Sequence, residues 1–316
     1  MSLFALIVAL LLEQLNPVSS RKYGHGWLSS YAGFFQHHFN AGEYSHGRVA
    51  WLLAVLPLLI GVMAVYGWLY HLHPLLAWAF NVLVLYLTLG FRPFAQSFTA
   101  IQQALRSNQL KEARELLSQW RGRAMSELNA DEIARVTTEQ ALISALRHLF
   151  GVIIWFSLFS LLGLGGAAGA LLYRLGLGLR TQKADEFNDE ELGEGKYNAY
   201  SRKMFYLLEW LPIRMTAATF AIVGNFEDTA YCWRSQAASW PEGEIGILLA
   251  SGAGALGVRL GLPIRQDGAL LNRPELGVGN NKADFASMQS TIGLVWRSLV
   301  VWLVILFMLS LASLLG

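Results

Sequence analysis

Charged residues and cysteines are scarce in this chain, and each scarcity excludes a class of protein. Only 15% of its 316 residues are charged, and 24 Lys and Arg residues against 22 Asp and Glu residues give a formal net charge of +2. This small surplus, with no basic tail or stripe, argues against nucleic acid as a partner. The single cysteine, Cys232, excludes an internal disulfide and a cysteine-rich metal site.

Strong catalytic motifs are also lacking. The sequence contains no P-loop lysine motif, no GxSxG elbow and no assignable Ser, His and Asp set. The densest histidine group, His37, His38 and His46 with Glu43, fits no strong zinc spacing. No repeat of fixed period is present. The sequence therefore has to be interpreted from its apolar segments and from a few polar clusters.

What the chain has in excess is apolar sequence. Hydrophobic residues make up 54% of it, and the mean hydropathy is +0.39. Two runs contain no charged side chain: Val49 to Tyr70, with 22 residues, and Leu149 to Tyr173, with 25 residues. About 20 apolar residues cross the roughly 30 Å hydrocarbon core of a bilayer. We therefore predict an all-α, polytopic helical membrane protein whose first partner is membrane lipid, with further spans at Leu75 to Phe91 and Ser298 to Leu315.

Basic residues orient these predicted spans. The link His71 to Pro74 is uncharged and makes the first two spans an antiparallel hairpin, whereas eight Lys or Arg residues lie from Arg92 to Arg147. The positive-inside rule places that second loop in the cytoplasm. Its three-to-four spacing of apolar residues predicts an antiparallel helix pair, with Gly122 as a stop and Asn129 as a start.

The N-terminus has no basic segment or small-residue cleavage site, so we expect no signal cleavage, and Leu3 to Leu12 is too short to span a bilayer alone. The predicted organisation follows from these boundaries. It comprises an N-terminal interfacial segment (1–48), a transmembrane hairpin (49–91), the cytoplasmic helical loop (92–148), a transmembrane or re-entrant segment (149–180), an acidic linker (181–201), an amphipathic helix with a Gly/Arg-rich irregular module (202–293) and a C-terminal transmembrane helix (294–316).

The topology after Leu149 has two alternatives, because a full crossing would place Arg174 and Arg180 outside. Glycines between Gly163 and Gly169 could break the run into a re-entrant hairpin buried in protein. Alternatively, the segment Met204 to Val223 recrosses the membrane and buries its ionisable residues.

The stretch Gly252 to Gly261 is the most unusual local pattern. Gly252, Gly254 and Gly257 fit GxGxxG, but no alternating strands and helices surround them, although Ile245 to Ala250 could form a strand. Two interpretations remain: a tight turn packed on a helix, or backbone N–H groups close to an anion. In the second, forked donors for phosphate or carboxylate come from Arg259, Arg265 and Arg273.

Two further polar groups could carry chemistry. Glu209 and Arg214 lie in an apolar segment, where an ionisable pair indicates either a functional site or a structural ion pair. Asn225, Glu227 and Asp228 offer oxygen ligands suited to Mg²⁺, or equally serve as helix caps.

Five stretches, in order along the chain, together resemble the CobD/CbiB family of cobalamin-biosynthesis membrane proteins. They are LLLEQLNP (Leu10 to Pro17), SHGRVAW (Ser45 to Trp51), GGAAGALLYR (Gly165 to Arg174), LEWLPIRMTA (Leu208 to Ala217) and SGAGALGVRLG (Ser251 to Gly261). The resemblance implies a bacterial inner-membrane protein that joins an aminopropanol-type amine to a cobyric acid carboxylate with ATP and Mg²⁺. It also implies a corrinoid or nucleotide ligand. Our candidate catalytic residues are Glu139, Glu209 and Arg214.

The sequence departs from the family pattern at three places. An acidic and Asn-rich stretch is replaced by TEQALISALRHLFG, which leaves Glu139 and His148; apolar and basic residues occupy Leu177 to Arg180; and an Asp pair becomes Phe205 and Tyr206. The segment Leu208 to Asp228 is also similar to AmpE-type inner-membrane proteins, which are regarded as signalling proteins. That similarity implies the alternative of a catalytically degenerate sensor with a membrane-protein partner.

Overall fold

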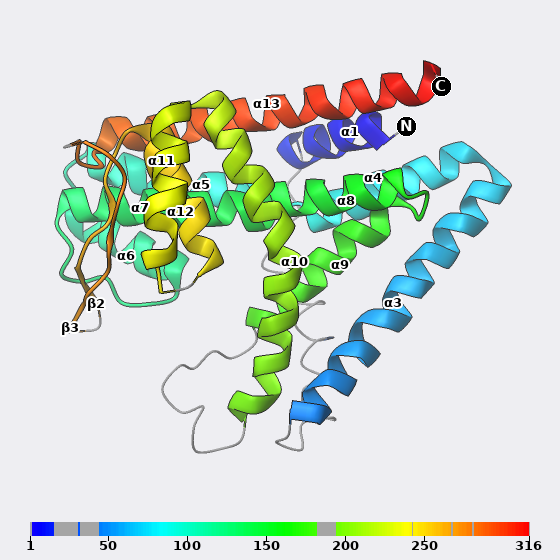
Figure 1. Cartoon of the computed structure of the whole chain (residues 1–316), viewed down its shortest axis with the longest axis horizontal. Coiled ribbons are helices and arrows are strands. Elements are labelled where there is room, and N and C mark those ends of the chain that lie inside the picture. The colour runs from blue at the N-terminus through cyan, green and yellow to red at the C-terminus, as the bar shows by residue number, and fades with distance from the viewer. Residues whose placement is uncertain are drawn as a thin grey trace. The chain divides into compact units, whose positions relative to one another are not determined.

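The computed structural model describes residues 2–15, 31, 44–181, 194–241, 243–266, 268–279 and 281–315 (Figure 1). Within these residues the protein is almost entirely helical, as predicted. His37, His38, Glu43 and most of the predicted acidic linker lie outside the described residues. The helices are α1 (Ser2–Leu15), α3 (Tyr44–Leu72), α4 (Pro74–Thr88), α5 (Phe91–Arg106), α6 (Leu110–Arg121), α7 (Ala130–Ala145), the π-helical turn η1 (Leu146–Phe150), α8 (Gly151–Leu161), α9 (Gly166–Thr181), α10 (Glu194–Val223), α11 (Phe226–Gln236), the 3₁₀ turn η2 (Ala237–Ser239), α12 (Glu244–Leu256) and α13 (Phe285–Leu315).

The chain forms two compact units, and each is described by itself. Unit 1 comprises Met1–Gly90, Arg147–Pro212 and Leu306–Gly316, and unit 2 comprises Phe91–Leu146 and Ile213–Ile305. In unit 1, α1 packs on α4, α3 packs on α4 and α9, and α8 packs on α9. In unit 2, α5, α6 and α7 pack on one another, and α12 packs on α11 and α7.

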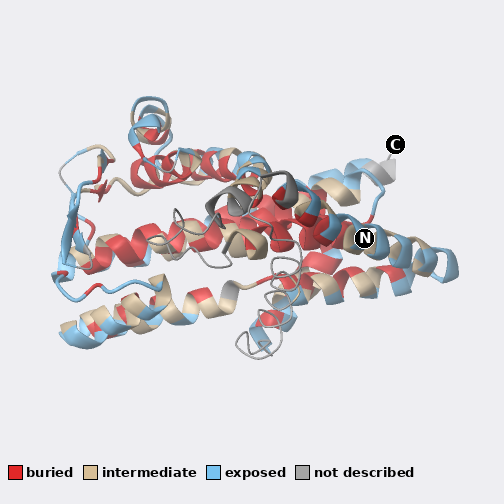
Figure 2. Cartoon of the chain, turned by 90° about the horizontal axis from the view of Figure 1, so that it is seen from below, coloured by how far each residue is buried: buried red, intermediate tan, exposed pale blue. Residues whose placement is uncertain are grey.

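Four helical segments are long and apolar enough to cross a membrane: Gly47–Leu72, Pro74–Arg106, Ala130–Leu161 and Phe285–Ala312. Helix α3 leaves large apolar side chains uncovered by protein, including Leu53, Ile60 and Trp68. Buried and exposed residues alternate along most of the helices in Figure 2. An exposed apolar surface of this extent is stable where lipid covers it. The protein is therefore a multi-pass membrane protein, as the uncharged runs predicted.

The 25-residue apolar run does not form one helix. Helix α8 ends at Leu161 and α9 begins at Gly166, and between them Gly163 and Gly165 have φ values of 73° and 85°. Such left-handed backbone is readily adopted by glycine. Gly169 lets α9 approach the backbone of Trp155, so α8 and α9 pack closely as a hairpin. The glycines therefore break the run into two helices, as the re-entrant alternative predicted. The position of this hairpin relative to a bilayer stays a prediction.

The loop predicted as an antiparallel helix pair contains three helices, namely most of α5 and the whole of α6 and α7. Helix α6 ends at Gly122, which has a φ of 73°, and α7 begins after Asn129. Asn129 and Glu132 form a reciprocal capping box with hydrogen bonds of 2.9 and 2.8 Å. Both predicted boundaries are confirmed. The core of these helices is apolar and includes Phe98, Ile101, Leu117, Leu128 and Ile133.

The Gly/Arg-rich module is more regular than its sequence indicated. The stretch Ile245 to Ala250, for which a strand was one possibility, is helical and belongs to α12. Helix α12 also contains Gly252 and Gly254. After α12 come two short antiparallel ladders, β1 (Leu260–Gly261) with β4 (Glu275–Leu276) and β2 (Ile264–Gln266) with β3 (Ala269–Leu271). This arrangement lacks the βαβ unit of a dinucleotide fold within the described residues.

Candidate functional site

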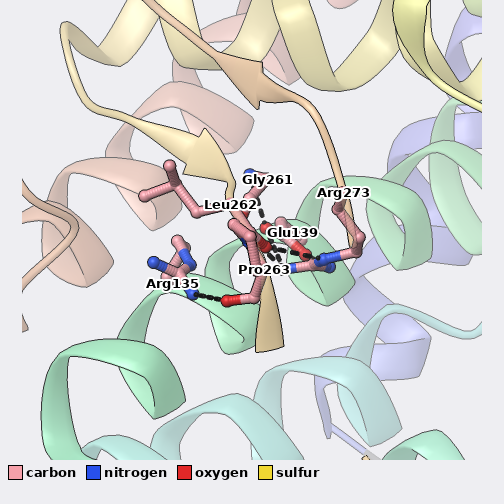
Figure 3. Close-up of polar contacts among 6 residues, drawn as sticks. All are labelled: Arg135, Glu139, Gly261, Leu262, Pro263 and Arg273. Carbon is pink, nitrogen blue, oxygen red and sulfur yellow. Dashed lines mark hydrogen bonds and ion pairs between the residues drawn. The ribbon is translucent and has the colours of Figure 1, made fainter. Parts of the chain in front are cut away.

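The polar centre of unit 2 is the ion pair between Glu139 on α7 and Arg273 in the loop between β3 and β4 (Figure 3). The Arg273 Nη1 donates to Glu139 Oε2 at 2.7 Å and its Nη2 to Oε1 at 3.4 Å. The Gly261 N–H donates to the same Oε1 at 2.8 Å. Both side chains are buried, so the pair is held in a region of low dielectric, where a two-point arginine–carboxylate contact is strongest.

Arg273 also fixes the strands around it. Its Nη2 donates to the Gly261 carbonyl at 2.8 Å and its Nε to the Leu262 carbonyl at 3.1 Å, while its guanidinium lies 5.6 Å from the Trp240 ring centre. Glu139 accepts three hydrogen bonds, so three of the roughly four acceptor sites of its carboxylate are committed to this network. The arrangement supports a positioning role for Glu139, which attaches the Gly/Arg-rich module to α7.

The glycines of the GxGxxG pattern serve helix packing. A Cβ on Gly254 would lie 2.6 Å from the Asp228 carbonyl oxygen of α11, and a Cβ on Gly252 would lie 2.5 Å from Leu142 Cδ1 of α7. Both glycines are inside α12, where backbone N–H groups are already bonded within the helix. Gly257 closes α12 with a left-handed φ of 65°. Of the two interpretations, the structure therefore favours close backbone packing.

The other two arginines proposed for anion binding each pair with a carboxylate. Arg259 Nε lies 3.1 Å from Glu275 and donates to the Gly279 carbonyl at 2.8 Å. Arg265, an exposed side chain, lies 3.3 Å from Glu127. Together with the Arg273 pair, these contacts distribute the three arginines over three separate carboxylates.

The predicted Mg²⁺ ligands act as a helix cap. Asn225 is the N-cap of α11: its Oδ1 accepts from the Asp228 N–H at 3.2 Å, and its Nδ2 donates to Asp228 Oδ2 at 2.7 Å. The Glu227 side chain is exposed. Among the described residues no cluster of three or more His, Cys, Asp and Glu side chains could hold a metal. In this structure Asn225 and Asp228 bond to each other at the start of α11, and binding of Mg²⁺ and ATP by the candidate residues stays a prediction.

Glu209 and Arg214 have different partners. Five residues along a helix turn the chain by about 140° from the same face, so the two side chains point apart. In unit 2, Arg214 donates to both carboxylate oxygens of Glu244 at the start of α12, at 2.5 and 3.2 Å. Arg214 therefore fits the interpretation as part of a structural ion pair, with Glu244 rather than Glu209 as its partner.

Glu209 belongs to a second polar centre, in unit 1. It is fully buried and accepts a hydrogen bond of 2.8 Å from Arg147 Nε, while Arg180 Nη1 lies 3.6 Å from its other oxygen. The Arg180 guanidinium covers the Phe205 and Tyr206 rings at 5.3 and 5.4 Å. Arg147 lies in the wide π-helical turn η1, a distortion that is frequent at functional sites.

This second centre unites the three places where the sequence departs from the family pattern. Arg147 comes from the first, Arg180 from the second, and Phe205 and Tyr206 from the third, with Glu209 at the centre. Sequence reasoning singled out Glu209 and missed the two arginines. The available signal was that each borders an apolar run, where an ionisable side chain requires a buried partner.

The fold and these two centres define a polytopic helical membrane protein with buried arginine–carboxylate networks. Comparison with known proteins gives the family: the profile of the CobD/Cbib protein family matches residues 6–185. The chain belongs to the CobD/CbiB family of cobalamin biosynthesis proteins. The expected resemblance is thus confirmed.

The relatives cover nearly the whole chain. It is 33% identical to the cobalamin biosynthesis protein CobD of Stutzerimonas stutzeri (strain A1501) over 97% of each chain. It is 34% identical to the CobD protein of Chromobacterium violaceum over 72% of this chain and 69% of the relative. It is 27% identical to the cobalamin biosynthesis protein CbiB of Salmonella typhimurium (strain LT2) over 79% of this chain and 77% of the relative. No solved structure matches significantly.

Proposed function

We propose that this chain acts in cobalamin biosynthesis at the bacterial inner membrane, as a ligase that joins an aminopropanol-type amine to a cobyric acid carboxylate. The observation that carries the proposal is the collinear match to CobD over 97% of both chains. Conservation of length and order across a multi-pass fold supports retention of the same role in the pathway. The four membrane-capable helices support a site at the membrane.

Amide formation from a free carboxylate and an amine releases water and therefore needs an activated carboxylate. The family resemblance implies that ATP and Mg²⁺ supply this activation. The described candidates for binding them are committed to other contacts, so the proposal assigns no residue to either group. Glu139 and Arg273 attach the Gly/Arg-rich module to α7.

The test is complementation. A bacterial strain that lacks its own synthase is supplied with this chain and grown on cobyric acid plus aminopropanol under conditions that require cobalamin. Growth is the expected result, and an empty vector is the negative control. Growth of every strain on cobinamide, which enters the pathway after amide formation, shows that the later steps are intact. The membrane level of the chain is measured by immunoblot in each strain.

A second function is favoured by one specific observation. Glu139, Arg214, Arg259 and Arg273 are all engaged in arginine–carboxylate pairs, which supports structural rather than catalytic roles for these candidates and hence a non-catalytic AmpE-like sensor or regulator. Its ligand would be a corrinoid or a nucleotide, and its partner another membrane protein. Failure of complementation at a normal membrane level would contradict the ligase proposal and favour this one.

A further inference from the structure

Arg297 on α13 is an exposed cation inside a membrane-capable helix, the segment Phe285–Ala312. From Ser298 to Leu315 the helix has no charged residue, which at 1.5 Å per residue is about 27 Å of uncharged helix. This length nearly matches the hydrocarbon thickness of a bilayer. When α13 crosses a membrane, Arg297 is therefore at the edge of the hydrocarbon, where long basic side chains reach the lipid headgroups. Its neighbour Trp296 is also exposed, and tryptophan is enriched at this depth.

The exposed side chains of α13 change from polar to apolar at the same point. About two turns before Arg297, Gln289 and Ser290 are exposed and polar. One and two turns after it, Val300 and Val304 are exposed and apolar, at 54% and 53%. Residues three, four and seven apart share a face of a helix, so the valines continue along the helix from the arginine. This face therefore combines a cation with an apolar ridge.

The Arg297 guanidinium is oriented by two backbone carbonyls and keeps a donor available. Its Nη1 donates to the carbonyl of Val223, the last residue of α10, at 3.2 Å, and its Nε donates to the Gly293 carbonyl at 3.2 Å. Among the described residues its Nη2 has no hydrogen-bond partner and the guanidinium has no carboxylate partner. The positive charge is therefore fixed in place without being compensated by these residues.

Gly293 leaves space beside the available donor. A Cβ on Gly293 would lie 3.9 Å from Arg297 Nη2. Apart from the backbone of α13 itself and the residues next to Gly293, no other described atom lies within 4 Å of that position. A ligand atom can therefore approach Nη2 from the side of the glycine.

The chemistry of this face selects a lipid with an anionic headgroup. Phosphate oxygens accept charge-assisted hydrogen bonds from the fork of a guanidinium group. At the edge of the hydrocarbon, phosphate belongs to phospholipids, and an acyl chain below it would lie along the two valines. A zwitterionic headgroup carries its own cation beside the phosphate, whereas an anionic headgroup does not. An uncompensated arginine therefore favours the anionic lipid.

We propose that Arg297 and Gly293, with Val300 and Val304, form a binding site for one anionic phospholipid, whose phosphate accepts from Arg297 and whose acyl chain covers the valines. All four residues belong to unit 2. The site does not depend on the proposed ligase activity, since a regulator in the same membrane could use it.

The test compares two lipids with the same acyl chains on the full chain purified in maltoside detergent. Dioleoyl phosphatidylglycerol or dioleoyl phosphatidylcholine is titrated into the micelles, and thermal unfolding is followed. We expect phosphatidylglycerol to raise the midpoint temperature at lower concentration than phosphatidylcholine. Arg297→Gln should weaken the apparent affinity for phosphatidylglycerol about fivefold, the usual contribution of one basic residue near an anionic membrane surface. Arg297→Lys keeps the charge but loses the fork, so it should retain part of the preference.

Two further variants separate lipid binding from folding. Gly293→Leu keeps Arg297 and its charge but fills the space beside Nη2, so the preference for phosphatidylglycerol should fall, while leucine favours the helix and the chain should still fold. Arg234→Gln removes the charge of an exposed arginine on α11 and is the matched control. It should leave the preference unchanged.

The proposal is overturned if phosphatidylglycerol stabilises the parent no more than phosphatidylcholine does, or if Arg297→Gln keeps the full preference. A second copy of this chain is the competing occupant of the face. It would be detected by light scattering as a dimer of the parent that Arg297→Gln dissociates, with no difference between the two lipids. That result would equally overturn the proposal.

Discussion

Glu139 and Arg273 lie 134 residues apart in the chain and form a two-point ion pair, with hydrogen bonds of 2.7 and 3.4 Å, inside unit 2. The pair is almost completely buried. Buried ion pairs contribute little net stability compared with apolar replacements, but removal of one partner leaves an uncompensated charge. The contact therefore acts mainly as a specific attachment of the loop between β3 and β4 to α7.

A double-mutant cycle tests this attachment. Glu139→Gln keeps an acceptor for the Gly261 N–H but leaves Arg273 without its counter-charge, so we expect it to destabilise unit 2 by about 3–5 kcal/mol. In Glu139→Gln combined with Arg273→Met, the buried charge is gone, and stability should recover in part. Denaturant unfolding in detergent measures the coupling. Simple additivity of the two single changes would show that the pair is not an energetic unit.

The Glu209 centre yields a second prediction. Glu209→Gln removes the only negative charge of the triad with Arg147 and Arg180 and should destabilise the folded chain by about 3–5 kcal/mol. Glu227→Gln removes an equivalent charge at an exposed position of α11 and should change stability by less than about 0.5 kcal/mol. The midpoint of thermal unfolding in detergent compares the two. Equal effects would contradict the assignment of Glu209 as a buried counter-charge.

The features that sequence predicted correctly are local. The uncharged run Val49 to Tyr70 identified a membrane-capable helix, Gly47–Leu72, because length and polarity decide whether a helix can span lipid. Gly122 and Asn129 marked helix ends because their effects act within one turn of the backbone. Family membership followed from short stretches spread along the chain.

The polar centres could not be predicted in the same way. Arg147 and Glu209 are 62 residues apart, and nothing local to either residue specifies the other as its partner. Glu209 and Arg214 are close in sequence, yet helix geometry separates them. Glycine density was equally ambiguous: in Gly252 and Gly254 it reflects contact between helices, which has the same sequence signature as a ligand loop.

Cys232 provides a chemical test of packing in unit 2. Burial, with a smaller effect of the Asp228 charge, raises the pKa of its thiol from 9.0 to about 11. The folded chain retains the thiol proton between these two pH values while the unfolded chain loses it, so stability should fall as the pH rises from 9 to 11.

The same shift in pKa should protect the thiol from reagents. Because the thiolate is the nucleophile, iodoacetamide at pH 8 should label the folded chain far more slowly than the chain in denaturant. Since Cys232 is the single cysteine, the incorporated label reports on this site alone. Rapid labelling of the folded chain at pH 8 would mean that the contact between α11 and its neighbours opens readily.

Gly254 and Gly61 form a matched pair of helical glycines with opposite expectations. A Cβ on Gly254 would lie 2.6 Å from the Asp228 carbonyl oxygen, which belongs to the backbone and cannot rotate away, whereas a Cβ on Gly61 meets nothing within 4 Å. Gly254→Ala should therefore separate α11 from α12 and cost about 1–3 kcal/mol. Gly61→Ala should be neutral or stabilise α3 by up to about 1 kcal/mol, because alanine favours the helix. Unfolding of both variants in the same detergent provides the comparison. If Gly254→Ala were tolerated as well as Gly61→Ala, the assignment of Gly254 to close packing of α12 on α11 would be wrong.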